Sequence, residues 1–174
     1  MKRLVRKRKA VGLDYGVSFL VFLLCKLIEQ VGIVIVGVVD GQGGGIGAHV
    51  VERLRKSLPE AIEIIALGAN AVATAAMMKA GANRGATGEN AIRYTAPRLD
   101  IIAGGIAIIQ PHSMMGEMTP AMVEAIAQSP ARKIIMPLRS ADVEVVGLRG
   151  EPIPHLIEEL VQRVAVIVKE GKDV

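Results

Sequence analysis

An uninterrupted run of small and β-branched apolar residues, Val31 to Val39, ends at Asp40. Such a run lacks the alternation of a half-exposed strand and is typical of a strand buried on both faces of a parallel sheet. A glycine-rich turn follows, and then Ile46, Val50 and Leu54 recur at helical spacing. The pattern predicts a strand, a glycine turn and an amphipathic helix in that order.

The rest of the chain repeats this alternation. We expect further strands at Ile62–Leu67, Leu99–Ala103 (broken by Gly104 and Gly105), Arg132–Pro137 and Asp142–Gly147, a short strand at Ala91–Thr95, and a loop at Asn83–Asn90. Helices are predicted at Ala71–Ala80, capped by Asn70 and stopped by Gly81, and from Thr119-Pro120 to before Ser129-Pro130. The last helix has the clearest apolar stripe, from Ile153 to Val168.

Strands that alternate with helices indicate right-handed βαβ units. The predicted fold class is therefore α/β, with a three-layer, doubly wound, mostly parallel, Rossmann-like sheet. The length of 174 residues suits one domain, which we place at residues 31–174, behind an N-terminal extension at residues 1–30.

Charge and aromatic residues are concentrated in this extension. Residues 1–30 carry seven basic and two acidic side chains, a charge of +5, so the remainder of the +4 chain carries −1. Three of the four aromatic residues also lie there, and Tyr94 is the only one after residue 30. Nucleic acid is therefore not the expected partner of the domain. Cys25 is the only cysteine, which excludes an internal disulfide and a cysteine-based zinc site, and we expect a cytoplasmic protein.

The extension has three interpretations. Its basic start and the apolar stretch Val17–Leu24 resemble a secretory signal, but Lys26 and Glu29 stand where a cleavage site is needed. Its charge-free runs are far shorter than the ~20 residues of a membrane-spanning helix. The protein would therefore contact a membrane only if the extension is retained in the native protein and lies on the membrane surface. The favoured interpretation is a start codon assigned too early, with translation beginning near Leu27 or Val31.

The glycine turn is the best candidate for function. Glycines let the backbone approach a ligand, and the first N–H groups of the next helix have no partners within the helix. A phosphate there also gains from the helix dipole. Asp40 can hold the turn or contact a ligand hydroxyl. The proposed binding residues are Asp40, Gly41, Gln42, Gly43, Gly44, Gly45, Ile46 and Gly47, and the alternative is a glycine turn required only for packing.

The spacing resembles that of short-chain dehydrogenases, but hydride transfer is not supported. The segment after the second strand, Ala66–Asn70, has no acidic residue for a ribose and no arginine for a 2′-phosphate. Asn70 is a weak substitute, and we favour it as a helix cap. The dehydrogenase Tyr-x-x-x-Lys pair is missing, and no Lys-Ser/Thr pair makes the turn a P-loop.

Three further loops are expected at the same edge of the sheet, because ligands of doubly wound folds bind beyond the carboxyl ends of the strands. The binding candidates in these loops are Thr87, Gly88, Glu89, Asn90, Gly104 and Gly105. The weak candidates for acid/base chemistry are Glu89, His112 and Glu117. Turn formation or plain solvation explains each of them equally well or better. No spacing indicates a metal site. Met114, Met115 and Met118 are expected at a core edge.

Several motifs in order resemble a family: Asp40-Gly-Gln-Gly-Gly-Gly-Ile-Gly47, Ile64-Ile-Ala-Leu-Gly68, Gly85-Ala-Thr-Gly-Glu-Asn-Ala-Ile92 and Gly116-Glu117 with Thr119-Pro120. The chain from about Val31 to Leu148 looks like a short, Rossmann-like bacterial family that is a functionally uncharacterised domain of unknown function. The resemblance implies a start close to the first strand and a polar or acidic residue at the position of His112. It implies no reaction.

The leading hypothesis is therefore a domain that binds a nucleotide or another phosphorylated metabolite, with an adenine dinucleotide among the candidate cofactors, on the N–H groups of Gly43 to Gly47. A homodimer would be one way to close the site, and a second apolar stripe on the last helix would favour it. The alternatives are a small acid/base enzyme acting on a sugar phosphate or nucleotide, and an interaction module with a purely structural turn.

Overall fold

The computed structural model describes residues 34–138, 143–146 and 150–170. The chain divides into residues 1–32 and 33–174, and every described residue belongs to the second unit. The predictions for residues 1–30 lie outside the described residues.

Five parallel strands form one sheet in the order β3-β2-β1-β4-β5. They are β1 (Ile35–Asp40), β2 (Glu63–Gly68), β3 (Arg84–Thr87), β4 (Ile101–Gly105) and β5 (Arg132–Met136). The order reverses direction between β1 and β4, which lie side by side. This is the doubly wound arrangement, and the predicted fold class is confirmed.

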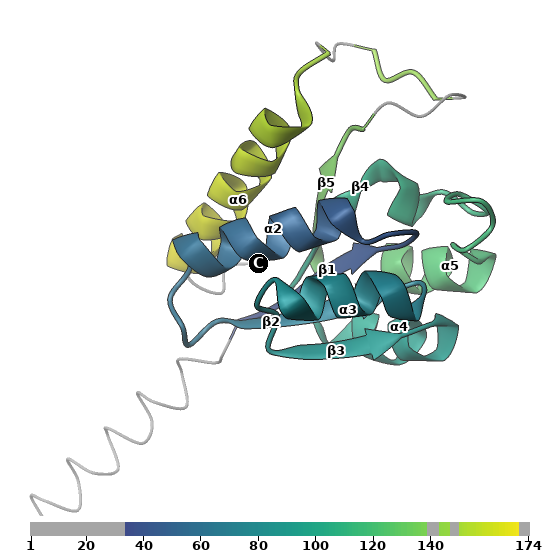
Figure 1. Cartoon of the computed structure of the whole chain (residues 1–174), viewed down its shortest axis with the longest axis horizontal. Coiled ribbons are helices and arrows are strands. Elements are labelled where there is room, and N and C mark those ends of the chain that lie inside the picture. Colours follow the sequence, from purple (N-terminus) through teal and green to yellow (C-terminus); the bar gives the residue numbers. More distant parts are fainter. Residues whose placement is uncertain (1–33, 139–142, 147–149, 171–174) are drawn as a thin grey trace, which may run out of the picture. The chain divides into compact units, whose positions relative to one another are not determined.

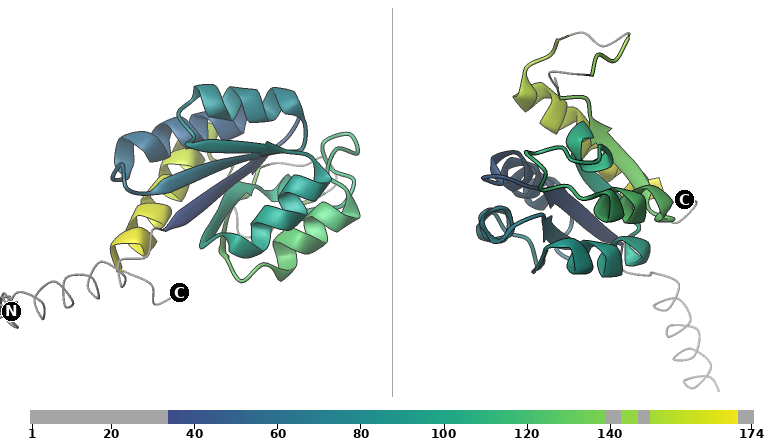
Figure 2. Two further views of the ribbon diagram at one scale, coloured as in Figure 1. Left: turned by 90° about the horizontal axis from the view of Figure 1, so that it is seen from below. Right: turned by 90° about the vertical axis from the view of Figure 1, so that its right-hand side faces the viewer.

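Helices cover both faces of the sheet, as Figures 1 and 2 show. On one face lie α2 (Gly45–Ser57), α3 (Ala71–Lys79) and α6 (Ile153–Glu170), and on the other lie α4 (Glu89–Thr95) and α5 (Pro120–Gln128) with the short 3-10 helices η1 (Ala96–Arg98) and η2 (Ile106–Ile109). Among the helices of the described ranges, none is long and apolar enough to cross a bilayer.

The side chains of each strand alternate between two cores. Val36 and Val38 pack into the core under α2, α3 and α6, whereas Val39 packs into the core under α4 and α5. The same alternation separates Ile64 from Ile65 on β2. Burial on both faces explains why these strands appear in the sequence as continuous apolar runs.

Local signals place the helix ends. The side chain of Asn70 accepts the N–H of Ala73 and caps α3, and Thr119 accepts the N–H of Met122 before Pro120 begins α5. Gly81, after α3, has a φ of 111°, which is the left-handed region where glycine is favoured. The predicted caps and the predicted ends of α3 and α5 are therefore confirmed.

Four sequence predictions were wrong. Residues 84–87 of the predicted loop form β3, and the predicted strand at Ala91–Thr95 is part of α4. Gly104 and Gly105 do not break β4 but are its last two residues and pair with β1 and β5. Within the predicted strand Asp142–Gly147, the described residues 143–146 contain only an isolated bridge at Val143.

Candidate functional site

Three loops meet beyond the carboxyl ends of β2, β1 and β4, the three central strands. They are the glycine turn after β1, the Ala69-Asn70 link after β2, and the long segment between η2 and α5. This edge includes the point between β1 and β4 where the strand order reverses, which is where ligands of open α/β sheets bind.

Asp40 organises the glycine turn from the end of β1. Its Oδ1 accepts the N–H of Gly41 (2.9 Å) and its Oδ2 accepts the N–H of Gly47 (2.6 Å). Burial raises the pKa of the Asp40 carboxyl; the two backbone hydrogen bonds oppose this rise, and the nearby charge of Glu117 adds to it. Asp40 thus holds the turn, one of the two roles predicted for it.

Glu117 joins all three loops. Its Oε2 accepts the N–H of Gln42 (2.7 Å) and the Nδ2 of Asn70 (2.8 Å). The same Asn70 amide group donates to the carbonyl of Gln42 (3.0 Å), while its Oδ1 caps α3. Both polar atoms of Asn70 are therefore bonded within the protein, and Glu117 serves to position the turn.

The segment that delivers Glu117 has an unusual backbone. His112, Met114 and Met115 have φ values of 62°, 55° and 59°, in the left-handed region that costs energy for residues other than glycine. The N–H of His112 donates to the carbonyl of Met118, and the N–H of Glu117 donates to that of Met114. These bonds fix the loop. The only residue of this segment whose type indicates a left-handed backbone in the sequence is Gly116, whose φ is 89°.

Three N–H groups of the turn have no acceptor among the described residues: those of Gly43, Gly45 and Ile46. The N–H of Gly44 donates to the carbonyl of Gly41 (2.9 Å), and that of Gly47 is taken by Asp40. The N-cap residue Gly44 makes no side-chain hydrogen bond to α2, and the first turn of α2 contains no acidic residue. The predicted set of donors from Gly43 to Gly47 is thereby reduced to three.

The glycines of the turn differ in what surrounds them. A Cβ at Gly43 or Gly45 would meet nothing within 4 Å, whereas a Cβ at Gly44 would lie 2.6 Å from the Cα of Ala73. Gly44 also has a φ of 68°. A Cβ at Gly47 would lie 2.7 Å from Asp40 and Met77. Gly44 and Gly47 therefore serve packing, and Gly43 and Gly45 border open space.

Of the remaining candidates, those from Thr87 to Asn90 and Gly104-Gly105 lie at or just after the carboxyl ends of β3 and β4. Thr87 Oγ1 shares a hydrogen bond with Thr74 Oγ1 (2.7 Å), and the carboxylate of Glu89 accepts the hydroxyl of Thr119 (2.6 Å) and pairs with Arg93 (3.6 Å). Asn90 is exposed, as is His112. Gly88 precedes α4 with a φ of 86°.

The two glycines that end β4 are buried. A Cβ at Gly104 would lie 2.7 Å from the Val39 carbonyl oxygen, and one at Gly105 would lie 2.7 Å from the Leu138 side chain. Met118 is buried and Met114 packs beside the second core, but Met115 is 95% exposed, against expectation. The described part of the chain holds no group of three or more potential metal ligands.

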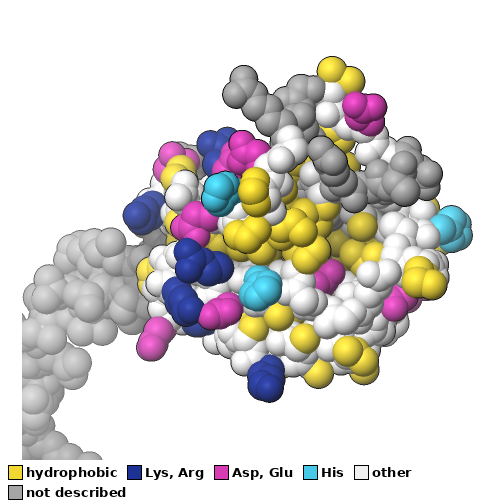
Figure 3. Space-filling model, turned by 45° about the horizontal axis from the view of Figure 1, so that its top comes forward, with side chains coloured by type: hydrophobic (Ala, Val, Ile, Leu, Met, Phe, Trp, Pro, Cys, Tyr) yellow, Lys and Arg dark blue, Asp and Glu magenta, His cyan; other side chains and the backbone are white. Residues whose placement is uncertain are grey.

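Apolar surface accompanies the edge that carries the turn. Ile46, Leu138 and Leu156 are half-buried and pack against the core under α2 and α6. Figure 3 shows hydrophobic side chains gathered in a hollow of this face, with charged and histidine side chains around part of it.

Taken together, the parallel sheet, the two helical layers and the glycine turn at the strand reversal define a single-domain, Rossmann-like α/β protein. The sequence profile described as Domain of unknown function (DUF3842) matches residues 35–169. The chain belongs to this family, which confirms the resemblance in the sequence to an uncharacterised family. A search of curated proteins found no match.

Proposed function

We propose that the glycine turn binds the phosphate of a nucleotide or another phosphorylated small metabolite. The observation that carries the proposal is the group of three N–H donors, at Gly43, Gly45 and Ile46, that lack an acceptor in the described part of the chain. The N–H groups at the start of a helix attract anions through hydrogen bonds and the helix dipole. α2 has 13 residues, and its N-cap residue Gly44 makes no side-chain hydrogen bond that would compete for the three donors.

Open space beside these donors supports the proposal. The positions of a Cβ at Gly43 and at Gly45 are free of protein atoms within 4 Å, so an oxyanion has room to approach. By contrast, the turn is rigidly supported from behind through Asp40 and Glu117. Donors that are already oriented lose little entropy when a ligand binds, which favours affinity.

Two carboxylates near the turn restrict the ligand. Asp40 and Glu117 contribute negative charge behind the donors, which disfavours a compact dianion such as inorganic phosphate. A diester or pyrophosphate spreads its charge over more atoms and is the better match. The half-buried apolar surface formed by residues such as Ile46 and Leu138 suits the base or other apolar body of such a ligand.

The test is thermal unfolding in the presence of ADP, NAD⁺, AMP, glucose 6-phosphate or inorganic phosphate. A ligand at about 100 times its Kd stabilises the folded state by about 2.7 kcal/mol, a shift of several degrees for a domain of this size. Gly45→Val places methyl groups in the open space of the turn and should abolish the shift. Ala71→Val, at the exposed first residue of α3, is the matched control and should preserve it.

Two results would overturn the proposal. One is the absence of any shift with the whole panel. The other is an equal shift for Gly45→Val and Ala71→Val, because a ligand on these N–H groups cannot tolerate a branched side chain at Gly45.

A further inference from the structure

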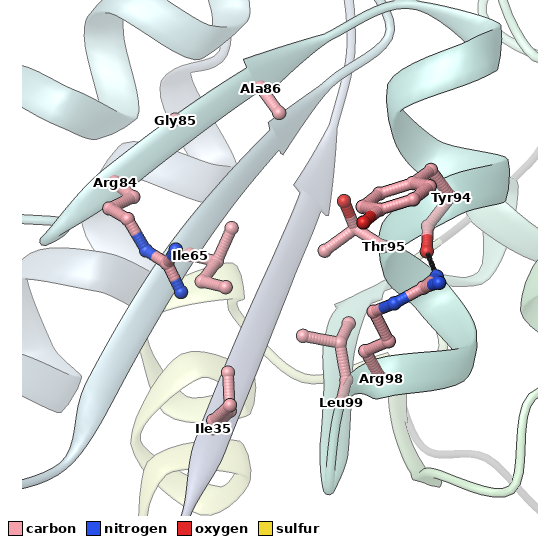
Figure 4. A pocket seen from close by; sticks show the side chains of 9 residues that line it. All are labelled: Ile35, Ile65, Arg84, Gly85, Ala86, Tyr94, Thr95, Arg98 and Leu99. Atoms are coloured by element: carbon pink, nitrogen blue, oxygen red, sulfur yellow. Dashed lines mark hydrogen bonds between the residues drawn. The ribbon is translucent and has the colours of Figure 1, made fainter.

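A cavity of about 280 Å³ lies far from the glycine turn along the strands, on the sheet face that carries α4. Ile35 and Arg84 are the first residues of β1 and β3, so the cavity opens toward the amino ends of the strands, whereas the turn lies at their carboxyl ends. Figure 4 shows its nine lining residues. α4 and the η1 helix that follows it contribute Tyr94, Thr95 and Arg98 to this lining.

The floor of the cavity is apolar. It consists of Ile35 from β1, Ile65 from β2 and Leu99, which precedes β4. Ile65 and Leu99 also belong to the core under α4 and α5, so their positions are fixed by packing on their other sides. An apolar floor of fixed shape is the usual base of a small-molecule site.

The walls are cationic and aromatic. Among the described residues, the lining includes Arg84 and Arg98 and no acidic residue. The ring of Tyr94, which is 64% exposed, lies at the wall opposite Arg84, and the guanidinium carbon of Arg98 stands 3.8 Å from the centre of that ring. Tyr94 is the only aromatic residue after residue 30, and it is placed on the surface and not in the core.

Both arginines keep N–H groups for a ligand. Arg84 uses its Nε for an ion pair with Glu63, and Arg98 uses one terminal nitrogen for the carbonyl of Tyr94. Their other N–H groups have no hydrogen-bond acceptor among the residues that the structure describes. Guanidinium groups bind carboxylates and sulfonates through two parallel hydrogen bonds and stack on aromatic planes.

From these features we infer that the cavity is a second binding site, for a small aromatic acid. The ring system would lie on Ile35, Ile65 and Leu99 beside Tyr94, and the anionic group would contact Arg98 or Arg84. Size narrows the class further. A cavity of about 150 Å³ holds one benzene ring, so a cavity of about 280 Å³ matches two fused rings with one carboxylate.

The experiment is calorimetric titration of the full-length chain with 2-naphthoate, with 2-naphthalenemethanol as the neutral analogue of the same shape. Arg98→Gln should weaken the binding of 2-naphthoate about tenfold or more, since it removes a charge-assisted contact. The same variant should change the binding of the neutral analogue less than threefold. Arg98→Lys keeps the positive charge but not the planar pair of N–H donors, so it should recover part of the lost affinity for 2-naphthoate.

Further variants separate binding in this cavity from binding elsewhere on the protein. Ala86→Leu, which fills the cavity, should weaken both compounds, and Arg163→Gln on the exposed face of α6 should weaken neither. Gly45→Val should leave naphthoate binding intact, so this inference and the phosphate proposal can fail separately. Unfolding curves of each variant report whether the fold is kept.

The inference is overturned if 2-naphthoate does not bind at millimolar concentration, or if its affinity is unchanged by Arg98→Gln and Ala86→Leu in folded variants. It is also overturned if the chain forms a dimer whose interface occupies the cavity. A thiol crosslink between two chains that forms in Arg84→Cys, is absent from the parent and does not form at low protein concentration would reveal such a dimer.

Discussion

Asp40 and Gly47 are seven residues apart and are joined by a 2.6 Å hydrogen bond from the Gly47 N–H to Asp40 Oδ2. The bond ties the end of β1 to the first turn of α2 across the whole glycine turn. The other carboxylate oxygen holds Gly41. The two oxygens of one side chain therefore hold both ends of the loop that displays the free donors.

Replacement of Asp40 by Asn should destabilise the protein. The amide has only one acceptor oxygen, so one of the two N–H groups, Gly41 or Gly47, faces an NH₂ donor instead. A partly buried donor without a partner costs about 1–3 kcal/mol. Urea unfolding at pH 7 measures this loss, and an Asn variant as stable as the parent would show that the carboxylate is not the support of the turn.

The pKa of Asp40 also predicts a pH dependence. Burial raises this pKa above 3.8 in the folded protein, so the folded state binds the proton more tightly than the unfolded state. The resulting stabilisation is present in full below pH 3.8 and is lost as the pH rises through the folded pKa, with a slope of at most about 1.4 kcal/mol per pH unit.

This dependence is measured as the difference in the free energy of unfolding between the parent and Asp40→Asn at successive pH values. The difference should shrink as the pH rises from about 3.8 and then become constant. A difference that grows with pH over this range would mean that the hydrogen bonds from Gly41 and Gly47 outweigh burial.

Adjacent glycines of the turn should respond in opposite ways to alanine. Gly44→Ala introduces a Cβ at a φ of 68° and 2.6 Å from the Ala73 backbone, and we expect a loss of about 2 kcal/mol or more. Gly43→Ala meets open space and should change stability by less than about 0.5 kcal/mol. Thermal unfolding of the two variants side by side checks the contrast, and equal effects would contradict the described turn.

Glu117→Ala should loosen the junction of the three loops. The Gln42 N–H and the Asn70 amide each lose an acceptor, which costs about 1–3 kcal/mol in total for these partly exposed groups. Hydrogen exchange of the Gln42 N–H should speed up, while that of Gly47, held by Asp40, should not. Unchanged exchange at Gln42 would mean that Glu117 does not protect it.

Glu124→Ala provides the control for this experiment. Glu124 lies on the exposed face of α5 and bonds only Gln128 within the described residues. Its replacement removes the same charge but touches none of the three loops, so the exchange rate of Gln42 should remain that of the parent.

The elements that the sequence predicted well are those whose apolar pattern is dictated by burial, on both faces for β1 and β2 and on one face for α6. The caps at Asn70 and Thr119 were also predicted, because one side chain suffices to begin a helix. The exposed positions of α6 are of mixed character: Glu159, Gln162 and Arg163 are polar or charged, whereas Ile153 and Val166 are apolar.

β3 and α4 were not predicted from the sequence, and the reasons are physical. Arg84-Gly85-Ala86-Thr87 is mostly exposed at the sheet edge and becomes a strand only by pairing with β2, which no local pattern reveals. Tyr94 and Thr95 favour strands intrinsically, yet the turn at Gly88 begins a helix through the Ile92 N–H bond to its carbonyl. Tertiary pairing decides the structure of β3, and the local turn at Gly88 decides that of α4.

The candidate site was predicted in its position but not in its internal bonding. The sequence indicated that Asp40, Asn70 and Glu117 lie at one edge, but it could not show that Glu117 reaches Gln42 from a loop 75 residues away. That contact depends on three left-handed residues other than glycine, which only the fold around them can hold.

The shortness of α4 has a consequence for the evolution of this domain. α4 and η1 occupy residues 89–98 of the connection between β3 and β4, and we expect a helix longer by one or two turns to lie over Ile35 and Ile65. The open floor of the sheet therefore depends on the length of this connection as well as on the small side chain of Ala86. We expect insertions in this crossover, or a large side chain at Ala86, to close it.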